Sequence, residues 1–404
     1  MARTREIDRR TDLDWLRIGA FALLILYHVA MFYVPWDWTV KSLRLLPWLE
    51  IPMDWSSPWR LLVLFVVSGA ATRFMADKLA PGALLAMRSH RLLLPLLFGI
   101  AIVIPPQSYL QAVEQFGYQG SFGDFLGLYL HPGRDLCRDD GACLFLPRWE
   151  HMWFVGYIWF YTVLLIAVLK WAPRAVGQLR KAGEAWLSGA RLIWMPIVVL
   201  FLAALGLRHF FPPTHNFYDD WYLHPVYLFC FLFGYLFARS AAIWVGFMRW
   251  RWIALGLALV AYGLDAAYAW HYQGRLAPFA LRLTMVPVEA VDQWAWTAAA
   301  LGFARRHLVD RDGPVRRYLT EAIFPFYIVH QTIIVVVAHN VAKLGLPIGL
   351  EAGILIASTV AGCALTVELV RRISWLRPWF GLKRVARSST VCAKFDPPIE
   401  SVRT

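Results

Sequence analysis

Long apolar runs constrain this chain more than any other feature of its sequence. A helix that crosses a membrane needs about 20 mostly apolar residues. Runs of that kind occupy residues 16–35, 58–76, 91–108, 152–171, 192–211, 221–239, 252–270, 283–303, 318–341 and 347–370. The 404-residue chain is 59% hydrophobic and has a mean hydropathy of +0.50. A single soluble core of this length could not bury that much apolar surface. We therefore predict an all-α polytopic membrane protein, a bundle of about ten transmembrane helices.

Basic residues collect in alternate connections between these runs. Arg and Lys crowd the N-terminus and the second, fourth, sixth and eighth connections, whereas the remaining connections are acidic or mixed. By the positive-inside rule, this pattern places both termini in the cytoplasm. It also explains the formal net charge of +13, so we expect contacts with membrane lipids and not with nucleic acid. Residues 1–387 are predicted to form one transmembrane domain, and residues 388–404 a cytoplasmic tail.

The largest external segment is predicted to run from about Gln107 to Glu150. It contains "CRDDGAC", a polar stretch with Cys137 and Cys143 at its ends. These cysteines would pair if the loop lies outside the cytoplasm, where disulfides persist, and the sequence leaves that pairing open.

The first apolar run carries two ionisable residues, Arg17 and His28, separated by ten residues. Eleven helical steps of about 100° make just over three turns, so both side chains share one face. The rise between them is about 16 Å, roughly half of the hydrocarbon core. We therefore expect Arg17 near the cytoplasmic interface and His28 near the midplane, where ionisable side chains are usually functional. The plainer alternative is that Arg17 reaches lipid phosphates and His28 hydrogen-bonds a neighbouring helix.

Arg88 and Arg91, in "MRSHRLLLP", lie three residues apart on one face at the cytoplasmic start of the third run. With Arg17 they would form an anion site suited to phosphates, which guanidinium groups bind through paired hydrogen bonds. Ordinary positive-inside charge explains the same residues without a ligand.

Three further ionisable residues lie within or beside apolar runs. His151 precedes the fourth run at its external edge, and His330 lies around the middle of the ninth. Glu321 comes about two and a half turns before His330. An interfacial position alone explains His151, whereas His330 is harder to explain without a function. The sequence has no H-E-x-x-H, paired Cys/His spacing or G-x-S-x-G, so we predict neither a metal site nor a serine hydrolase.

An ordered set of motifs resembles the acyltransferase-3 superfamily of bacterial membrane acyltransferases over nearly the whole chain. "DLDWLRIGAFALLILYHVAMFY" is similar to the first helix of that family, with its Arg-x10-His motif at Arg17 and His28. "RSHR", from Arg88 to Arg91, matches the family's Arg-x-x-Arg element. "FVVSG", "HMWFV" and "FPFYIVHQ" are similar to its later signatures, in the same order. "YVPWDWTVKS" and the long external loop look most like the branch that contains glucan biosynthesis protein C, which is associated with succinylating osmoregulated periplasmic glucans.

The resemblance implies an integral O-acyltransferase of the bacterial inner membrane. Such an enzyme would move a succinyl or acetyl group from cytoplasmic acyl-CoA to hydroxyls of an extracytoplasmic glycan. His28 would be the catalytic residue, as a general base or a transient acyl carrier. Arg17, Arg88 and Arg91 would bind the phosphates of coenzyme A, and no metal would take part.

The remaining candidate residues would bind substrate. His330 and Glu321 would line the same cavity as His28, and His151 would lie at its external mouth. The competing hypothesis is a transporter or flippase that carries a glycan or acyl intermediate without acyl-transfer chemistry. Inverted repeats and paired broken helices would support transport, and neither is clear in the sequence.

Overall fold

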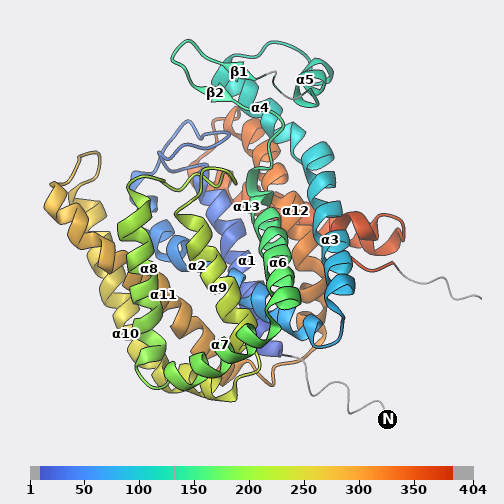
Figure 1. Ribbon diagram of the computed structural model, residues 1–404. Helices are drawn as coiled ribbons and strands as arrows, with labels where there is room; N and C mark the ends of the chain where they lie inside the picture. Colours follow the sequence, from blue (N-terminus) through green and yellow to red (C-terminus); the bar gives the residue numbers. More distant parts are fainter. Residues whose placement is uncertain (1–9, 132, 134, 385–404) are drawn as a thin grey trace, which may run out of the picture.

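The protein is described by a computed structural model that covers residues 10–131, 133 and 135–384. These residues form a bundle of long helices with a small hairpin domain at one end (Figure 1). The α-helices are α1 (Thr11–Met31), α2 (Glu50–Ala76), α3 (Pro81–Phe98), α4 (Pro105–Phe116), α5 (Phe122–Tyr129), α6 (Trp153–Trp171), α7 (Pro173–Trp186), α8 (Arg191–Ala203), α9 (Leu223–Phe237), α10 (Ala241–His271), α11 (Phe279–His307), α12 (Pro314–Ala342) and α13 (Ile348–Arg372). Shorter elements are η1 (Pro47–Leu49), η2 (Gly99–Val103), η3 (Glu150–Met152), η4 (Ala204–Arg208), η5 (Arg377–Phe380), β1 (Leu136–Cys137) and β2 (Cys143–Leu144).

Ten of these helices correspond to the ten predicted apolar runs. In the described part of the chain, eight are long and apolar enough to cross a membrane: α1, α2, α3, α6, α8, α10, α12 and α13, some of them extended by short turns. The other two are α9, which is apolar but only 15 residues long, and α11, which has 29 residues and carries several charges. The predicted all-α polytopic architecture is therefore confirmed.

Small residues let the central helices α2 and α9 approach backbone to backbone. A Cβ atom added at Gly69 would lie 1.9 Å from the carbonyl oxygen of Phe231, and one added at Gly234 would lie 1.9 Å from that of Val66. Neither position has room for a side chain, so both helices need glycine at the crossing. Gly69, at the end of the "FVVSG" motif, thus has the helix-packing role that small residues usually have in membrane proteins.

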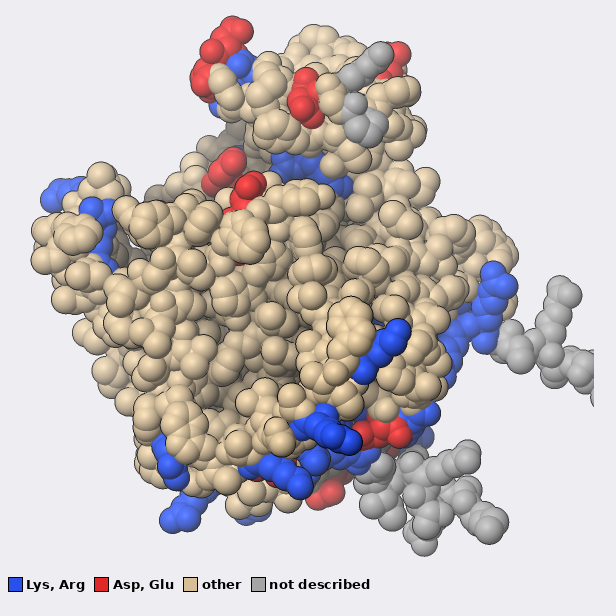
Figure 2. All heavy atoms as spheres, viewed as in Figure 1, with Lys and Arg blue, Asp and Glu red and all other residues tan. Residues whose placement is uncertain are grey.

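Ion pairs hold several helix ends together at one end of the bundle. Asp12 and Asp14, at the start of α1, pair with Arg305 at the end of α11 and with Arg316 at the start of α12. Figure 2 shows Lys and Arg side chains gathered mainly at this end, where α1 starts and α7 lies in Figure 1. This distribution agrees with a cytoplasmic location of this end. The predicted cytoplasmic N-terminus and tail, residues 1–9 and 388–404, lie outside the described residues.

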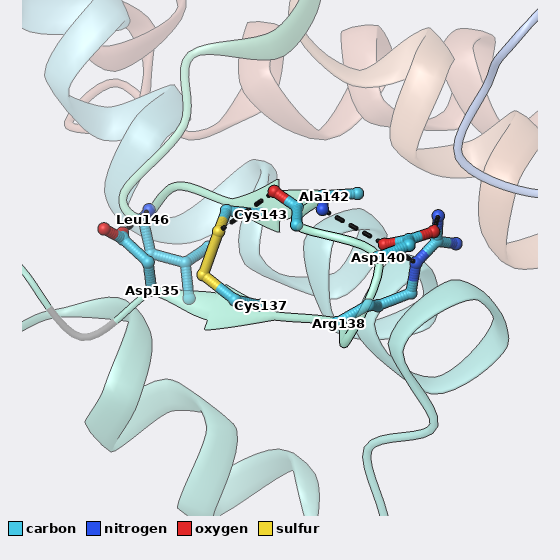
Figure 3. Close-up of a disulfide and its surroundings, with 8 residues drawn as sticks. Asp135, Cys137, Arg138, Asp140, Ala142, Cys143 and Leu146 are labelled. Atoms are coloured by element: carbon cyan, nitrogen blue, oxygen red, sulfur yellow. Dashed lines mark hydrogen bonds and ion pairs between the residues drawn. A yellow bond between two sulfur atoms is a disulfide. The ribbon is translucent and has the colours of Figure 1, made fainter.

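The opposite end carries α4, α5 and an antiparallel hairpin in which β1 pairs with β2 (Figure 1). Cys137 and Cys143 face each other in that hairpin and are joined by a disulfide (Figure 3). Asp140 closes the turn by accepting hydrogen bonds from Arg138 and from the backbone N–H of Ala142. The pairing that the sequence left open is therefore present, as expected for a loop outside the cytoplasm.

Candidate active site

Three histidines from distant parts of the chain meet inside the helix bundle. His28 lies on α1, His151 on η3 and His330 on α12. The His28 and His330 rings are stacked, with centroids 5.0 Å apart, and Nδ1 of His28 lies 2.8 Å from Nε2 of His330. The His151 ring centroid is 5.0 Å from that of His330 and 6.5 Å from that of His28. His330 and His151 are buried, whereas His28 keeps part of its surface accessible.

Backbone carbonyls determine which nitrogens of the neutral rings carry protons. Nδ1 of His330 lies 2.8 Å from the carbonyl oxygen of Tyr327, which only accepts hydrogen bonds, so this nitrogen donates. Nε2 of His330 must then accept, and Nδ1 of His28 donates to it. The proton of His28 is thereby placed on Nδ1. Its Nε2 is left as the basic nitrogen, which is the arrangement that a base or nucleophile requires.

A backbone carbonyl also fixes the position of the proton on neutral His151. Its Nε2 donates to the carbonyl oxygen of Ile328 at 3.1 Å, so its Nδ1 carries a lone pair. That Nδ1 is buried and has no hydrogen-bond partner among the described residues. The hydroxyl of Tyr327 donates to the backbone oxygen of His151 and ties η3 to α12. The cluster therefore presents two unprotonated ring nitrogens, on His28 and His151.

A polar network holds the α12 segment beside His330. The side-chain amide of Gln331 donates to Gln107 at 3.0 Å, and the amide of Gln107 donates to Thr332 at 3.0 Å. Thr332 in turn donates to the carbonyl oxygen of Val103, in the π turn of η2. Such turns free a carbonyl from the helical ladder and often occur at functional sites. Gln107 was not among the residues predicted from the sequence, although a side-chain amide within a predicted membrane run is a signal for a polar site.

The three predicted arginines lie on helices of the same bundle. Arg17 donates from Nη2 to the carbonyl oxygen of Thr320 on α12 at 3.1 Å. Arg88 is buried on α3 and contacts the hydroxyl of Thr162 on α6 at 3.4 Å, while its Nε has no hydrogen-bond partner among the described residues. Arg91 follows one turn later on α3 and is partly buried.

Along the helix axes, aromatic rings lie between the three predicted arginines and the histidine cluster. Phe21, Phe154 and Tyr327 touch edge to face, with ring centroids 5.2 to 6.4 Å apart. Along α1, Arg17 is followed by Phe21 and then by His28. Along α12, Thr320, which contacts Arg17, is followed by Tyr327 and then by His330. The chain runs the other way in η3 and α6, where His151 precedes Phe154 and then Thr162, which contacts Arg88. The arginines thus lie towards the basic end of the bundle, and the histidines lie deeper, beyond the aromatic rings.

Two predicted substrate-binding residues, Glu321 and His151, do not lie at the positions predicted for them. Glu321 does not join the histidines: Arg377 donates to its carboxylate at 2.8 Å, and Arg371 lies 3.6 Å from it. Glu321 lies about 14 Å from His330 along the α12 axis and anchors η5 against the bundle. His151 is not at an external mouth but buried within the cluster, because the chain after β2 descends into the bundle before α6 begins.

A shallow surface groove is separate from the cluster of His28, His151 and His330. It runs between α4 and the end of α12, and its lining residues are Pro106, Tyr109, Leu110, Phe122, Val336, His339 and Asn340. His339 pairs with Glu114 beside it.

Comparison with known proteins agrees with the motif resemblance. A model of the acyltransferase domain family matches residues 10–368. Among similar curated proteins is the glucans biosynthesis protein C of Shigella boydii serotype 4 (strain Sb227), 24% identical over 343 residues, which cover 80% of this chain and 81% of that protein. The proteins of the same name from Escherichia coli (strain K12) and Escherichia coli O157:H7 are 24% and 25% identical, with the same shares covered. No solved structure matches the chain.

The family match and the fold answer the question of class that the sequence left open. The match spans nearly all of the described helices, and it includes Arg17, His28, Arg88, Arg91, His151 and His330. The expectation of acyl transfer is therefore preferred over transport. The chain belongs to the acyltransferase-3 family, and it is a multi-pass membrane acyltransferase.

Proposed function

We propose that this acyltransferase lies in the inner membrane of a bacterium and transfers a succinyl or acetyl group from cytoplasmic acyl-CoA to hydroxyls of an extracytoplasmic glycan. The observation that carries the proposal is the hydrogen bond between His28 and His330, because it leaves Nε2 of His28 unprotonated in a partly accessible position. The similar proteins are named for glucan biosynthesis, which supports a glucan as the acceptor, an osmoregulated periplasmic glucan among the candidates.

The three predicted arginines are suited to bind the phosphates of the donor. Arg17, Arg88 and Arg91 lie on the basic side of the aromatic rings, and guanidinium groups bind phosphate through paired, charge-assisted hydrogen bonds. The pantetheine arm would then pass Phe21, Phe154 and Tyr327, which must separate to admit it. This route would bring the thioester from the cytoplasmic side to His28.

The chemical step uses His28 as its base. The hydroxyl oxygen of the acceptor attacks the thioester carbonyl carbon while Nε2 of His28 takes the hydroxyl proton. The carbon–sulfur bond then breaks, and the thiolate of coenzyme A leaves and recovers that proton. In the alternative order, Nε2 itself attacks the thioester and expels the thiolate of coenzyme A. The acceptor hydroxyl then displaces the acyl group from the ring, and its proton passes to that thiolate. His330 positions His28 in both routes by accepting the hydrogen bond from Nδ1. The unprotonated Nδ1 of His151 is available to accept a hydrogen bond from the acceptor.

Replacement of His28 tests this function directly. In proteoliposomes supplied with acyl-CoA and a glucan acceptor, His28→Ala is expected to lower acyl transfer by at least about 100-fold. Release of free thiol and mass spectrometry of the glucan measure the reaction. His271→Ala, an exposed histidine at the end of α10, is the matched control.

Two results would contradict the proposal. Retained transfer by His28→Ala at wild-type protein abundance would remove His28 from the chemistry. Movement of acceptor across the membrane by the wild-type protein without thiol release would favour the transporter hypothesis. Mass spectrometry of surface and periplasmic glycans from cells with and without the protein identifies the acceptor.

A further inference from the structure

A buried arginine that the mechanism does not use lies beside the histidine cluster. Arg60, on α2, is only 3% exposed. Its Nη1 donates to the hydroxyl of Ser56 at 3.1 Å, and its Nε has no hydrogen-bond partner among the described residues. No carboxylate of those residues forms an ion pair with it. The guanidinium also lies over the ring of Tyr27, whose centroid is 4.3 Å from its central carbon.

This arrangement is costly unless an anion joins it. An ionisable side chain inside a membrane protein is retained where it meets a partner charge or a ligand pathway. A buried guanidinium has several donors to satisfy, and Ser56 and the Tyr27 ring use only part of them. The side chain therefore lacks what it binds best, a planar oxyanion that accepts two parallel hydrogen bonds.

The position of Arg60 relates it to His28 and not to the phosphate site. Tyr27 immediately precedes His28, and their ring centroids are 6.1 Å apart. Arg60 and His28 therefore both contact the Tyr27 ring. Along α2 it is nearer to the outer end, Glu50, than to the basic end, Ala76. An anion held there is separated from Arg17 and Arg88 by the aromatic rings, so it is not a phosphate of the donor.

We propose that Arg60 determines acyl-group specificity by binding a carboxylate at the far end of the acyl chain. The inference rests on the proposed function. With the thioester carbonyl at Nε2 of His28, a succinyl chain carries its free carboxylate beyond the reacting carbon, towards the guanidinium on the neighbouring helix. An acetyl group has no such carboxylate and leaves the buried cation uncompensated, so the site discriminates against it. The sequence alone offered no residue for this distinction.

The test compares two donors on variants of one residue. Wild-type protein in proteoliposomes is assayed with succinyl-CoA and acetyl-CoA on the same uncharged glucan acceptor. Arg60→Met is expected to lower kcat/KM for succinyl-CoA by about 100-fold or more and to change that for acetyl-CoA by less than about threefold. Arg249→Met, which removes an exposed arginine of α10, is the matched control and keeps the wild-type ratio.

A second variant covers the case in which Arg60→Met does not accumulate. Arg60→Lys keeps the charge but loses the planar pair of donors, so it is expected to lower kcat/KM for succinyl-CoA by about tenfold and to spare acetyl-CoA. Free succinate should also inhibit the wild-type protein competitively, and this inhibition should weaken in Arg60→Lys.

The outcomes separate this inference from the function on which it rests. If wild-type protein transfers neither acyl group, the proposed function and this inference both fail. If transfer occurs but both donors lose activity equally in the folded Arg60 variants, Arg60 is structural and the inference alone is wrong. If the loss appears only with an acceptor that carries anionic groups, the carboxylate site belongs to the acceptor, which also overturns it.

Discussion

At the scale of single residues, the protonation of His28 depends on a neighbour that is 302 residues away in the chain. The backbone carbonyl of Tyr327 orients His330, and His330 orients His28. This relay resembles in principle the way an orienting group holds a catalytic histidine in the required tautomer. In the proposed mechanism His330 is a positioning residue that acts only through the ring of His28.

Loss of His330 should impair catalysis without removing the base. His330→Ala is expected to lower kcat by at least about tenfold, because His28 no longer has a fixed tautomer. His330→Gln supplies an acceptor near the position of Nε2 and should recover part of that loss. The pH profile of kcat should shift in His330→Ala and return towards wild type in His330→Gln. Equal loss in both variants with an unchanged profile would show a merely structural role.

Lys41 predicts how stability depends on pH. It lies in the loop after α1, where its ammonium donates to the carbonyl oxygens of Met31 and Val34, and burial lowers its pKa to about 8. The unfolded chain, with a lysine pKa near 10.5, binds more protons than the folded chain between these two values. This group therefore makes the free energy of unfolding rise as pH increases from about 8 towards 10.5.

The check is thermal unfolding in detergent at a series of pH values. Lys41→Met should flatten the rise in melting temperature between about pH 8 and 10 relative to wild type. Lys78→Met, in the turn after α2, serves as the control and should keep the wild-type slope. A steep rise that persists in Lys41→Met would assign the dependence to another group.

At the scale of elements, the crossing of α2 and α9 positions aromatic side chains that pack beside the histidine cluster. Phe65 on α2 packs against Phe154 beside the histidines and stacks on Tyr227 of α9. A change in the spacing of these helices would therefore move the aromatic rings below the cluster.

Gly69→Leu should destabilise this crossing. The added side chain meets the Phe231 backbone, which cannot move aside as a flexible side chain does, so we expect a loss of about 1–3 kcal/mol or more. Gly256→Leu, on α10, is the matched control, because a Cβ atom there meets no neighbour within 4 Å. Melting temperature and the fraction of monodisperse protein measure the difference. Equal stability of the two variants would contradict the close packing.

At the scale of the whole molecule, the hairpin and the basic end define opposite faces of the membrane. The disulfide between Cys137 and Cys143 and the alternation of basic connections support the same orientation. The proposed acyl transfer across the membrane needs this polarity, since the proposal places the donor and the acceptor on different sides.

Thiol labelling tests the orientation. In intact spheroplasts treated with reductant, a maleimide that does not cross membranes should label Cys137 and Cys143 from outside. A cysteine introduced by Ser188→Cys, in the exposed turn after α7, should react only after the membrane is permeabilised. Labelling of Ser188→Cys in intact spheroplasts would reverse the assigned sidedness.

Much of the architecture was predictable because it depends on local properties. Hydrophobic run length, the alternation of basic connections and the helical phase of Arg17 and His28 are all readable along the chain. The ten predicted runs accordingly match ten helices of the described residues, of which α9 is short and α11 is charged.

The assembly of the site was decided by tertiary packing. Only the packing of α1, η3 and α12 brings His28, His151 and His330 together. In the same packing Glu321 lies at the basic end of the bundle, paired with Arg377. Contacts between helices far apart in sequence depend on crossing positions and on side-chain shape, which no local pattern specifies. By itself, the sequence determined the spans, their direction and the face that Arg17 and His28 share. Only the structure decided which nitrogen of His28 is basic and that Arg60 lies beside it, since both depend on neighbours from other helices.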